Sequence, residues 1–509
     1  MDLFVKRGGI MNKVLDELKK RLAEVSDLKA AIAVLSWDQM TLMPSGGAAA
    51  RARQLATMER LAHEKAIAPE IGRLLEKLQP LVGTLPGSSV DASLIKIATR
   101  DYEREIKIPS SFTAEFSEHV SHTYESWAKA RSERNFKIVE PFLIKTLNYS
   151  RQLANFFPGY EHIADPLIDA MDEGLKVSVI RPLFDELRRE LVPLVQNITS
   201  FPPTDDSCLK QGFDEGRQLQ FGLRVAKALG YDFTSGRQDK SPHPFTTSFS
   251  IHDVRITTRV KEEELTEALF STIHETGHAL YEQGLKPELE ATPLASGVTM
   301  GIHESQSRLW ENLVGRSRHF WEHFFPELQK VFPEQLGKVS LDTFYQAINK
   351  VQRSLIRTDA DEVTYNLHVM IRFDLELKML EGKLAVADLP EAWNARYRAD
   401  LGITPPDDSV GVLQDMHWYS GTIGGYFQSY TLGNVLSAQF FEAALAAHPE
   451  ISREIAAGQF ETLHQWLKTN IYQYGRELPG AEIIKRATGK PMTIGPYIRY
   501  LKNKYGELY

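Results

Sequence analysis

The chain has 509 residues, of which 42% are hydrophobic and 25% charged, the composition of an ordinary globular protein. Its formal net charge of −8 argues against nucleic acid or an anionic membrane as its partner. No apolar run approaches the roughly 18 residues that span a bilayer. Residues 1–19, which include an alternative start at Met11, lack the apolar core of a secretory signal. The single cysteine, Cys208, excludes an internal disulfide, so a cytoplasmic location is expected.

The first half of the chain is dominated by helical patterns. The pattern over 11–77 is interrupted at 35–44, which is expected to form a packed corner ending at Pro44. A connection follows at 79–89, and a proline-rich loop at 201–207 makes Cys208 an exposed, incidental thiol. Further helices are predicted over 92–105, 110–134, 140–156, 177–199 and 214–229.

The pattern changes to that of strands between residues 231 and 260. The segments 246–251 and 255–260 are rich in β-branched and aromatic residues and flank a short turn. They predict a hairpin or small sheet directly before the next helix. Its edge is a hypothetical pairing site for the backbone of a peptide substrate.

The next helix carries the H-E-x-x-H pattern of zinc hydrolases in His274, Glu275 and His278. A spacing of four residues places both imidazoles on one helical face, about 6 Å apart along the axis, where they can share one Zn²⁺. Glu275 lies about 100° round the helix, the place of a general base rather than a ligand. The acidic run 262–264 and Gly284 predict a helix over 261–283. The alternative is a chance pattern of helical side chains.

A catalytic zinc site needs a third protein ligand, which must come from another segment. A second helix is predicted to open at Gly301 and to continue through Leu313. Glu304 would complete a His/His/Glu site, and the neighbouring His303 is a rival ligand. On spacing alone, a solvated surface glutamate remains the alternative for Glu304.

The remainder is again helical, which predicts one large, mainly α body with one small sheet beside the zinc helix. The segment 402–408 is predicted to be a loop, and the segment 417–425 is rich in glycine and aromatic residues. The tail at 491–509 is an ordered basic and aromatic segment. Helices are predicted over 342–355, 361–380, 388–397 and 435–467.

Six further elements, in order along the chain, resemble those of the carboxypeptidase Taq family of zinc metallocarboxypeptidases. One departure is Met40, where the family has an acidic residue. The matching elements are Trp37-Asp38-Gln39 with Thr41 and Met43-Pro44, His243-Pro244-Phe245, Asp253-Val254-Arg255-Ile256-Thr257, His303-Glu304-Ser305-Gln306, Ile356 to Asp361, and Gly411 to Trp418.

The resemblance implies a helical fold with a deep groove, similar to angiotensin-converting enzyme and neurolysin. It implies one catalytic domain over 1–509, with about 1–200 forming one wall of the groove. It also implies Glu304 as the third zinc ligand, with Co²⁺ as a substitute metal. The implied activity is release of single residues from peptide C-termini with broad preference, by a homodimer.

The resemblance also suggests the remaining site residues. His417 and Tyr426 are the candidate donors to the developing oxyanion, and a packed core aromatic is the alternative for Tyr426. Arg255 and Arg357 are the candidates for binding the substrate carboxylate, because a guanidinium fork matches two carboxylate oxygens. Each arginine has an alternative as an ion-pair partner, for instance of Asp253 or Asp361.

Two other residues of the matching elements are expected to have supporting roles. His243 is expected to shape the closed end of the groove. Asp361 either orients a metal-bound histidine or caps a helix.

Two rival functions remain on sequence grounds. An endopeptidase or a dipeptide-releasing enzyme would share the chemistry and differ only in how the groove is closed. A non-catalytic, zinc-containing peptide-binding protein is disfavoured, because structural zinc sites usually have four protein ligands.

Overall fold

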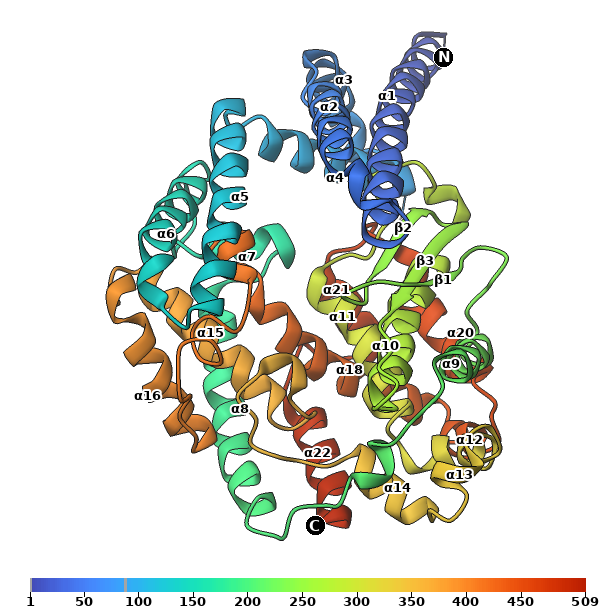
Figure 1. Ribbon diagram of the computed structural model, residues 1–509. Helices are drawn as coiled ribbons and strands as arrows, with labels where there is room; N and C mark the ends of the chain where they lie inside the picture. The colour runs from blue at the N-terminus through green and yellow to red at the C-terminus, as the bar shows by residue number, and fades with distance from the viewer. Residues whose placement is uncertain (1, 87–88) are drawn as a thin grey trace.

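The computed structural model describes residues 2–86 and 89–509. It is mainly helical, with a small three-stranded sheet next to the helix of the His274 motif (Figure 1), which confirms the predicted fold class. Of the predicted connection at 79–89, Gly87 and Ser88 lie outside the described residues. None of the described helices combines the length and apolar character needed to cross a membrane.

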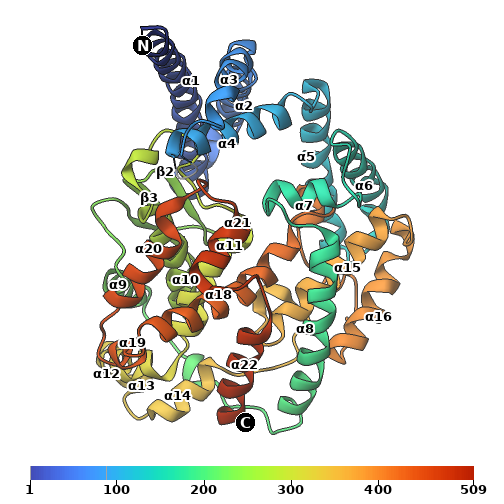
Figure 2. The same ribbon diagram turned by 180° about the vertical axis from the view of Figure 1, so that it is seen from behind.

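Four N-terminal helices form an arm at one end of the molecule, at the top of Figures 1 and 2. The predicted interruption at Leu35 is wrong, because the first helix continues to Thr41, where the hydroxyl donates to Trp37 O at 2.7 Å. The guanidinium carbon of Arg255 lies 4.5 Å from the ring centroid of Trp37. Because Arg255 belongs to the sheet, the arm ends against the sheet. The helices of the arm are α1 (Asp2–Thr41), α2 (Ala48–Ala66), α3 (Pro69–Val82) and α4 (Val90–Glu105).

Behind the arm, two hydrophobic cores share one helix, α18 (Phe427–Ala447). Leu432 and Val435 belong to the first core, and Leu436 and Phe440 belong to the second. The first core holds α5 (Ser110–Ser132), α6 (Glu140–Asn155), α7 (Asp165–Met171), α8 (Val177–Ile198), α15 (Tyr365–Leu380), α16 (Leu389–Leu401), α17 (His417–Ser420) and α22 (Gly495–Leu508).

The second core surrounds the sheet and the helix of the His274 motif. It holds α9 (Glu215–Leu229), α10 (Thr266–Gln283), α11 (Met300–Arg308), α12 (Arg318–Val331), α13 (Pro333–Leu336), α14 (Leu341–Ile348), α19 (Ile451–Ala456), α20 (Glu461–Asn470) and α21 (Gly480–Thr488).

The predicted hairpin is present as β2 (Thr246–Ser250) antiparallel to β3 (Asp253–Thr258). A third strand, β1 (Gln238–Lys240), pairs in parallel with β3, giving the order β1-β3-β2. The sequence did not predict β1, because its three polar residues carry no strand signal. Val254 and Ile256 of β3 are buried in the second core and anchor the sheet to it.

Several predicted boundaries and one predicted exposure are wrong. Residues 261–264 form a tight turn closed by a bridge, so α10 begins at Thr266 and the acidic run precedes it. The helix predicted over 435–467 starts earlier and breaks before Pro449, which cannot continue it. Cys208 is buried in the second core rather than exposed, and burial raises the pKa of its thiol to about 11.

Candidate metal centre and active site

The structure brings His274, His278 and Glu304 together, with one ligand atom from each lying within 4.8 Å of the others. Glu304 Oε2 lies 3.8 Å from His274 Nε2 and 3.4 Å from His278 Nε2. Ligands bonded at about 2.0–2.2 Å in tetrahedral geometry lie roughly 3.3–3.5 Å apart, so these donors fit one divalent ion. The three side chains predicted as metal donors therefore have the geometry that one bound ion requires.

Two glycines allow the helices around this cluster to approach closely. A Cβ atom at Gly277 of α10 would lie 2.7 Å from Gln306 O of α11. A Cβ atom at Gly433 of α18 would lie 2.5 Å from Glu304 Cγ. A larger residue at Gly277 would separate α10 from α11, and one at Gly433 would displace Glu304, which is why packing needs glycine at both positions.

Glu311 holds the outer nitrogen of His274, with Nδ1 lying 2.9 Å from Oε2. It belongs to the π-helical turn η5 (Leu309–Val314), which directly continues α11. Arg308 donates to Glu304 Oε1 at 2.7 Å and to Glu311 Oε2 at 3.2 Å, so it links the two carboxylates. Such outer contacts fix the ring orientation and tautomer of a metal-binding histidine.

His278 is held by a chain of two further side chains. Its Nδ1 lies 2.6 Å from His303 Nδ1, and His303 Nε2 lies 2.8 Å from Glu282 Oε1. If His278 Nε2 faces the metal, Nδ1 carries the proton and donates to His303, which in turn donates from Nε2 to Glu282. His303, the rival ligand in the sequence, thus lies behind His278 and orients it.

The charges of the cluster favour a bound cation. Burial lowers the pKa of His278 to about 3, which leaves the neutral imidazole that a metal ligand needs. Burial also disfavours the charged forms of His274 and Glu304, but the charges of neighbouring side chains have the larger effect on their pKa values. The carboxylates raise the pKa of His274, and Arg308 with the histidines lowers that of Glu304. The same negative charge that attracts a proton to His274 attracts a metal ion.

Glu275 points toward β2 rather than joining the three donors. Thr246 of β2 donates its hydroxyl to Glu275 Oε2 at 2.6 Å and so fixes the carboxylate. Burial raises the pKa of Glu275, which strengthens it as a base when it is ionised. The sheet therefore positions the predicted base.

A second group of charged residues comes from the first core. Asp415 accepts from Arg357 Nε at 2.5 Å and from Arg372 Nε at 3.1 Å, and its other oxygen lies 2.5 Å from His417 Nδ1. Arg357 also donates to the Tyr365 hydroxyl at 3.0 Å. Because one carboxylate neutralises only one of two guanidiniums, the group retains positive charge.

Tyr430 of α18 also belongs to this group, with its ring centroid 5.3 Å from the Arg357 guanidinium carbon, and sequence reasoning missed it. Its hydroxyl lies 3.0 Å from His417 Nε2. Burial and then the charges of Tyr365 and Glu304 raise its pKa above the usual value, although Arg357 opposes them. The predicted Tyr426 is 37% exposed and lies 5.8 Å from the His417 ring, centroid to centroid. The signal that could have identified Tyr430 is its position four residues after Tyr426, which places it one helical turn further along.

Arg255 and Asp361 have the protein contacts that their alternative roles require. Arg255 binds both oxygens of Asp253 at 2.8 Å while its guanidinium stacks on Trp37. Asp361 accepts from the backbone of Val363 and Thr364 and so caps the start of α15. Neither residue contacts the metal cluster.

His243 lies in the loop between β1 and β2. Burial and the positive charges of Arg259, Arg357 and His417 lower its pKa. Its expected role at the closed end of the groove stays a prediction.

Comparisons with known proteins identify the family of this chain. A sequence model of the carboxypeptidase Taq (M32) metallopeptidase family matches residues 17–505. Thermostable carboxypeptidase 1 of Thermus thermophilus is 40% identical over 96% of this chain and 97% of its own length. Carboxypeptidase 1 of Bacillus subtilis is 36% identical, with 97% of each chain covered.

A solved structure gives the same result. The M32 carboxypeptidase from Deinococcus radiodurans R1 matches with a TM-score of 0.95 and 48% identity, over 98% of this chain and 99% of its own. The family implies a divalent metal, for which the His/His/Glu cluster is present. The chain therefore belongs to the carboxypeptidase Taq (M32) family and is a metallocarboxypeptidase.

Proposed function

We propose that this metallocarboxypeptidase uses zinc and releases single amino acids from peptide C-termini. The observation that carries the proposal is the position of Tyr430 on α18. Its ring centroid lies 5.3 Å from the Arg357 guanidinium carbon, and Gly433, about one helical turn further along, packs on Glu304. With the substrate's C-terminal carboxylate bound at Arg357, the peptide bond at the metal cluster would be the one that joins the last residue to the rest of the peptide. Broad side-chain preference is proposed from the family resemblance.

Zinc is the proposed metal because two imidazoles and one carboxylate are a usual catalytic donor set for it. Cobalt is a proposed substitute with the same ligands. When bound, the ion supplies Lewis acidity, which polarises the scissile carbonyl and acidifies water.

The remaining chemistry belongs to side chains. Glu275 accepts the proton of the attacking water and passes it to the leaving amine, with Thr246 holding its carboxylate in place. Tyr430 donates to the developing oxyanion, and His417 donates from Nε2 when both of its ring nitrogens are protonated, with Nδ1 donating to Asp415. Tyr426 is a further donor in the proposal.

Arg357 is the proposed receptor for the substrate carboxylate. Two of its nitrogens are engaged by Asp415 and Tyr365, which orient the third. The positive charge left by Arg357 and Arg372 against Asp415 is balanced when an anion binds. Arg255 remains a second candidate, but its fork is already matched by Asp253.

We further propose one catalytic domain over residues 1–509, a homodimer, and a cytoplasmic location. The two cores share α18, so neither is complete without the other, which supports a single domain. The dimer is proposed from the family resemblance.

A blocked tripeptide and its C-terminal amide test the proposed activity. We expect the free acid to release its last amino acid, and the amide to react at least about 100-fold more slowly, because Arg357 loses its charged partner. The products are identified by mass. Equal cleavage of both peptides would indicate an endopeptidase, and release of a dipeptide would indicate a dipeptidyl carboxypeptidase.

We expect Tyr430→Phe to lower kcat by about 10²–10³-fold with little change in KM, because one donor to the oxyanion is lost. Tyr426→Phe is the matched variant, one helical turn away, and should have the smaller effect. Steady-state kinetics on the free-acid peptide measure both. A larger loss of kcat in Tyr426→Phe than in Tyr430→Phe would identify Tyr426 as the oxyanion donor instead.

A further inference from the structure

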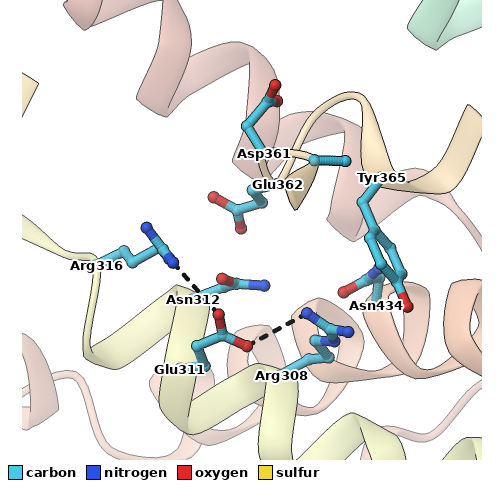
Figure 3. A pocket seen from close by; sticks show the side chains of 9 residues that line it. Arg308, Glu311, Asn312, Arg316, Asp361, Glu362, Tyr365 and Asn434 are labelled. Carbon is cyan, nitrogen blue, oxygen red and sulfur yellow. Dashed lines mark hydrogen bonds and ion pairs between the residues drawn. The ribbon is translucent and has the colours of Figure 1, made fainter. Parts of the chain in front are cut away.

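A small polar cavity is lined in part by Glu311, the residue that contacts His274 Nδ1 (Figure 3). The volume within which the centre of a water molecule can lie is about 30 Å³. The cavity wall comes from η5, α18 and the segment that leads into α15. The polar residues that matter here are Arg308, Glu311, Asn312, Arg316 and Glu362.

One oxygen of Glu362 has no hydrogen-bond partner among the described residues. The residue is 8% exposed, and Figure 3 shows its carboxylate directed into the cavity. Its other oxygen accepts from Lys504 at 2.7 Å and from the Tyr505 hydroxyl at 3.1 Å. A buried carboxylate oxygen without a donor is costly, so a donor inside the cavity is required.

The charged groups around the cavity favour a neutral ligand. Glu311 and Glu362 contribute carboxylates, whereas Arg308 and Arg316 line the wall and Lys504 pairs with Glu362. The carboxylate of Asp361 points away and binds backbone N–H groups (Figure 3). An anion would meet the unpaired oxygen of Glu362, and a metal cation would meet two guanidiniums. Water donates and accepts, and a space of about 30 Å³ holds about two molecules.

We propose that the cavity binds about two ordered water molecules, which link Glu362 to the arginine-bound Glu311. Through them, the Glu362–Lys504 pair is a positioning pair for Glu311 and hence for His274, which Glu311 contacts at 2.9 Å. The inference rests on the proposed role of His274 as a metal ligand.

The proposal gives the C-terminal segment a function in the site. Lys504 lies on α22, and the same helix contacts the cavity wall twice more. Tyr500 donates to Asn312 O at 3.1 Å, and Tyr497 donates to Glu362 O at 3.2 Å. The ordered basic and aromatic tail therefore supports the segments that hold Glu311 and Glu362.

The test is metal affinity in Glu362→Gln, a variant of unchanged size. Chelator competition with Zn²⁺ and the visible absorption spectrum of the Co²⁺ form are measured. We expect about 10-fold weaker Zn²⁺ binding and an altered Co²⁺ spectrum, with KM for the free-acid peptide unchanged once metal is saturating. Lys504→Met should shift both readouts in the same direction.

Lys502→Met is the matched control, because Lys502 lies on the same helix and pairs with Glu190 at an exposed position. It should behave as wild type. Wild-type affinity and spectrum in folded Glu362→Gln would overturn the inference, even if Lys504→Met fails to fold.

Crystals grown in bromide or rubidium salts test the ligand. Water density in the cavity supports the proposal, whereas an anomalous peak there would overturn it. His274→Ala tests the foundation separately: retention of wild-type zinc affinity in that variant would contradict the proposed metal centre itself.

Discussion

Glu275→Gln is expected to lower kcat by roughly 10³–10⁴-fold while leaving about one zinc per chain, because it removes the proton acceptor and no metal ligand. The amide has nearly the same size and still accepts the Thr246 hydroxyl, which donates to Glu275 Oε2 at 2.6 Å. Fold and substrate binding should therefore persist. Release of the terminal residue from a blocked tripeptide, together with metal analysis of the same sample, measures both quantities.

Glu267→Gln is the matched control for this variant. Glu267 lies on the same helix but pairs with Arg259 and Lys261, away from the metal cluster. It should retain nearly full activity. If Glu275→Gln kept more than about a tenth of the wild-type kcat with zinc bound, Glu275 would not be the base.

Glu304→Gln is expected to weaken zinc binding by more than about 100-fold, with activity lost in proportion to the unbound fraction. Glu304 is the one anionic donor of the cluster, and Arg308 and the histidines keep it ionised. A neutral amide cannot replace that charge. Arg308 retains Glu311 as a partner, so the fold should survive.

Chelation separates this effect from a loss of folding. Wild type stripped of metal should be inactive and should recover fully with one equivalent of zinc, whereas Glu304→Gln should need a large excess. Glu322→Gln, at an exposed pair on α12, should recover as wild type does. Recovery of Glu304→Gln with one equivalent would exclude Glu304 as a ligand.

The placement of the site between two cores explains why residues distant in the sequence are needed together. The second core supplies α10, α11 and the sheet, with the donors and the base. The first core supplies Arg357 and His417, and the shared helix α18 supplies Tyr430 and Gly433. A change in how the cores pack against α18 would move the proposed oxyanion donors relative to the proposed metal ligands.

The sequence by itself determined those features that depend on neighbours within a few residues. His274, Glu275 and His278 lie on one helix, so their relative directions follow from the helical repeat alone. The hairpin of β2 and β3 likewise follows from two adjacent β-rich segments and the turn between them. For the same reason, most helices were predicted within a few residues of their observed ends.

Only the tertiary structure decided which faces meet. His303 and Glu304 are neighbours that point about 100° apart on α11, and local sequence does not say which one faces α10. Close packing at Gly277 and Gly433 turns Glu304 toward the two histidines and leaves His303 behind His278. The pairing of Arg255 with Asp253 was an open alternative in the sequence, and the three-dimensional contacts selected it.

The same reason explains the misses at Tyr430 and Cys208. Both positions depend on contacts with segments far apart in the chain, since the Arg357 guanidinium lies 5.3 Å from the Tyr430 ring centroid and Cys208 is covered by the second core. Periodicity records how a segment alternates between buried and exposed faces. It does not record which partner covers each face, because that is fixed by packing the whole chain at once.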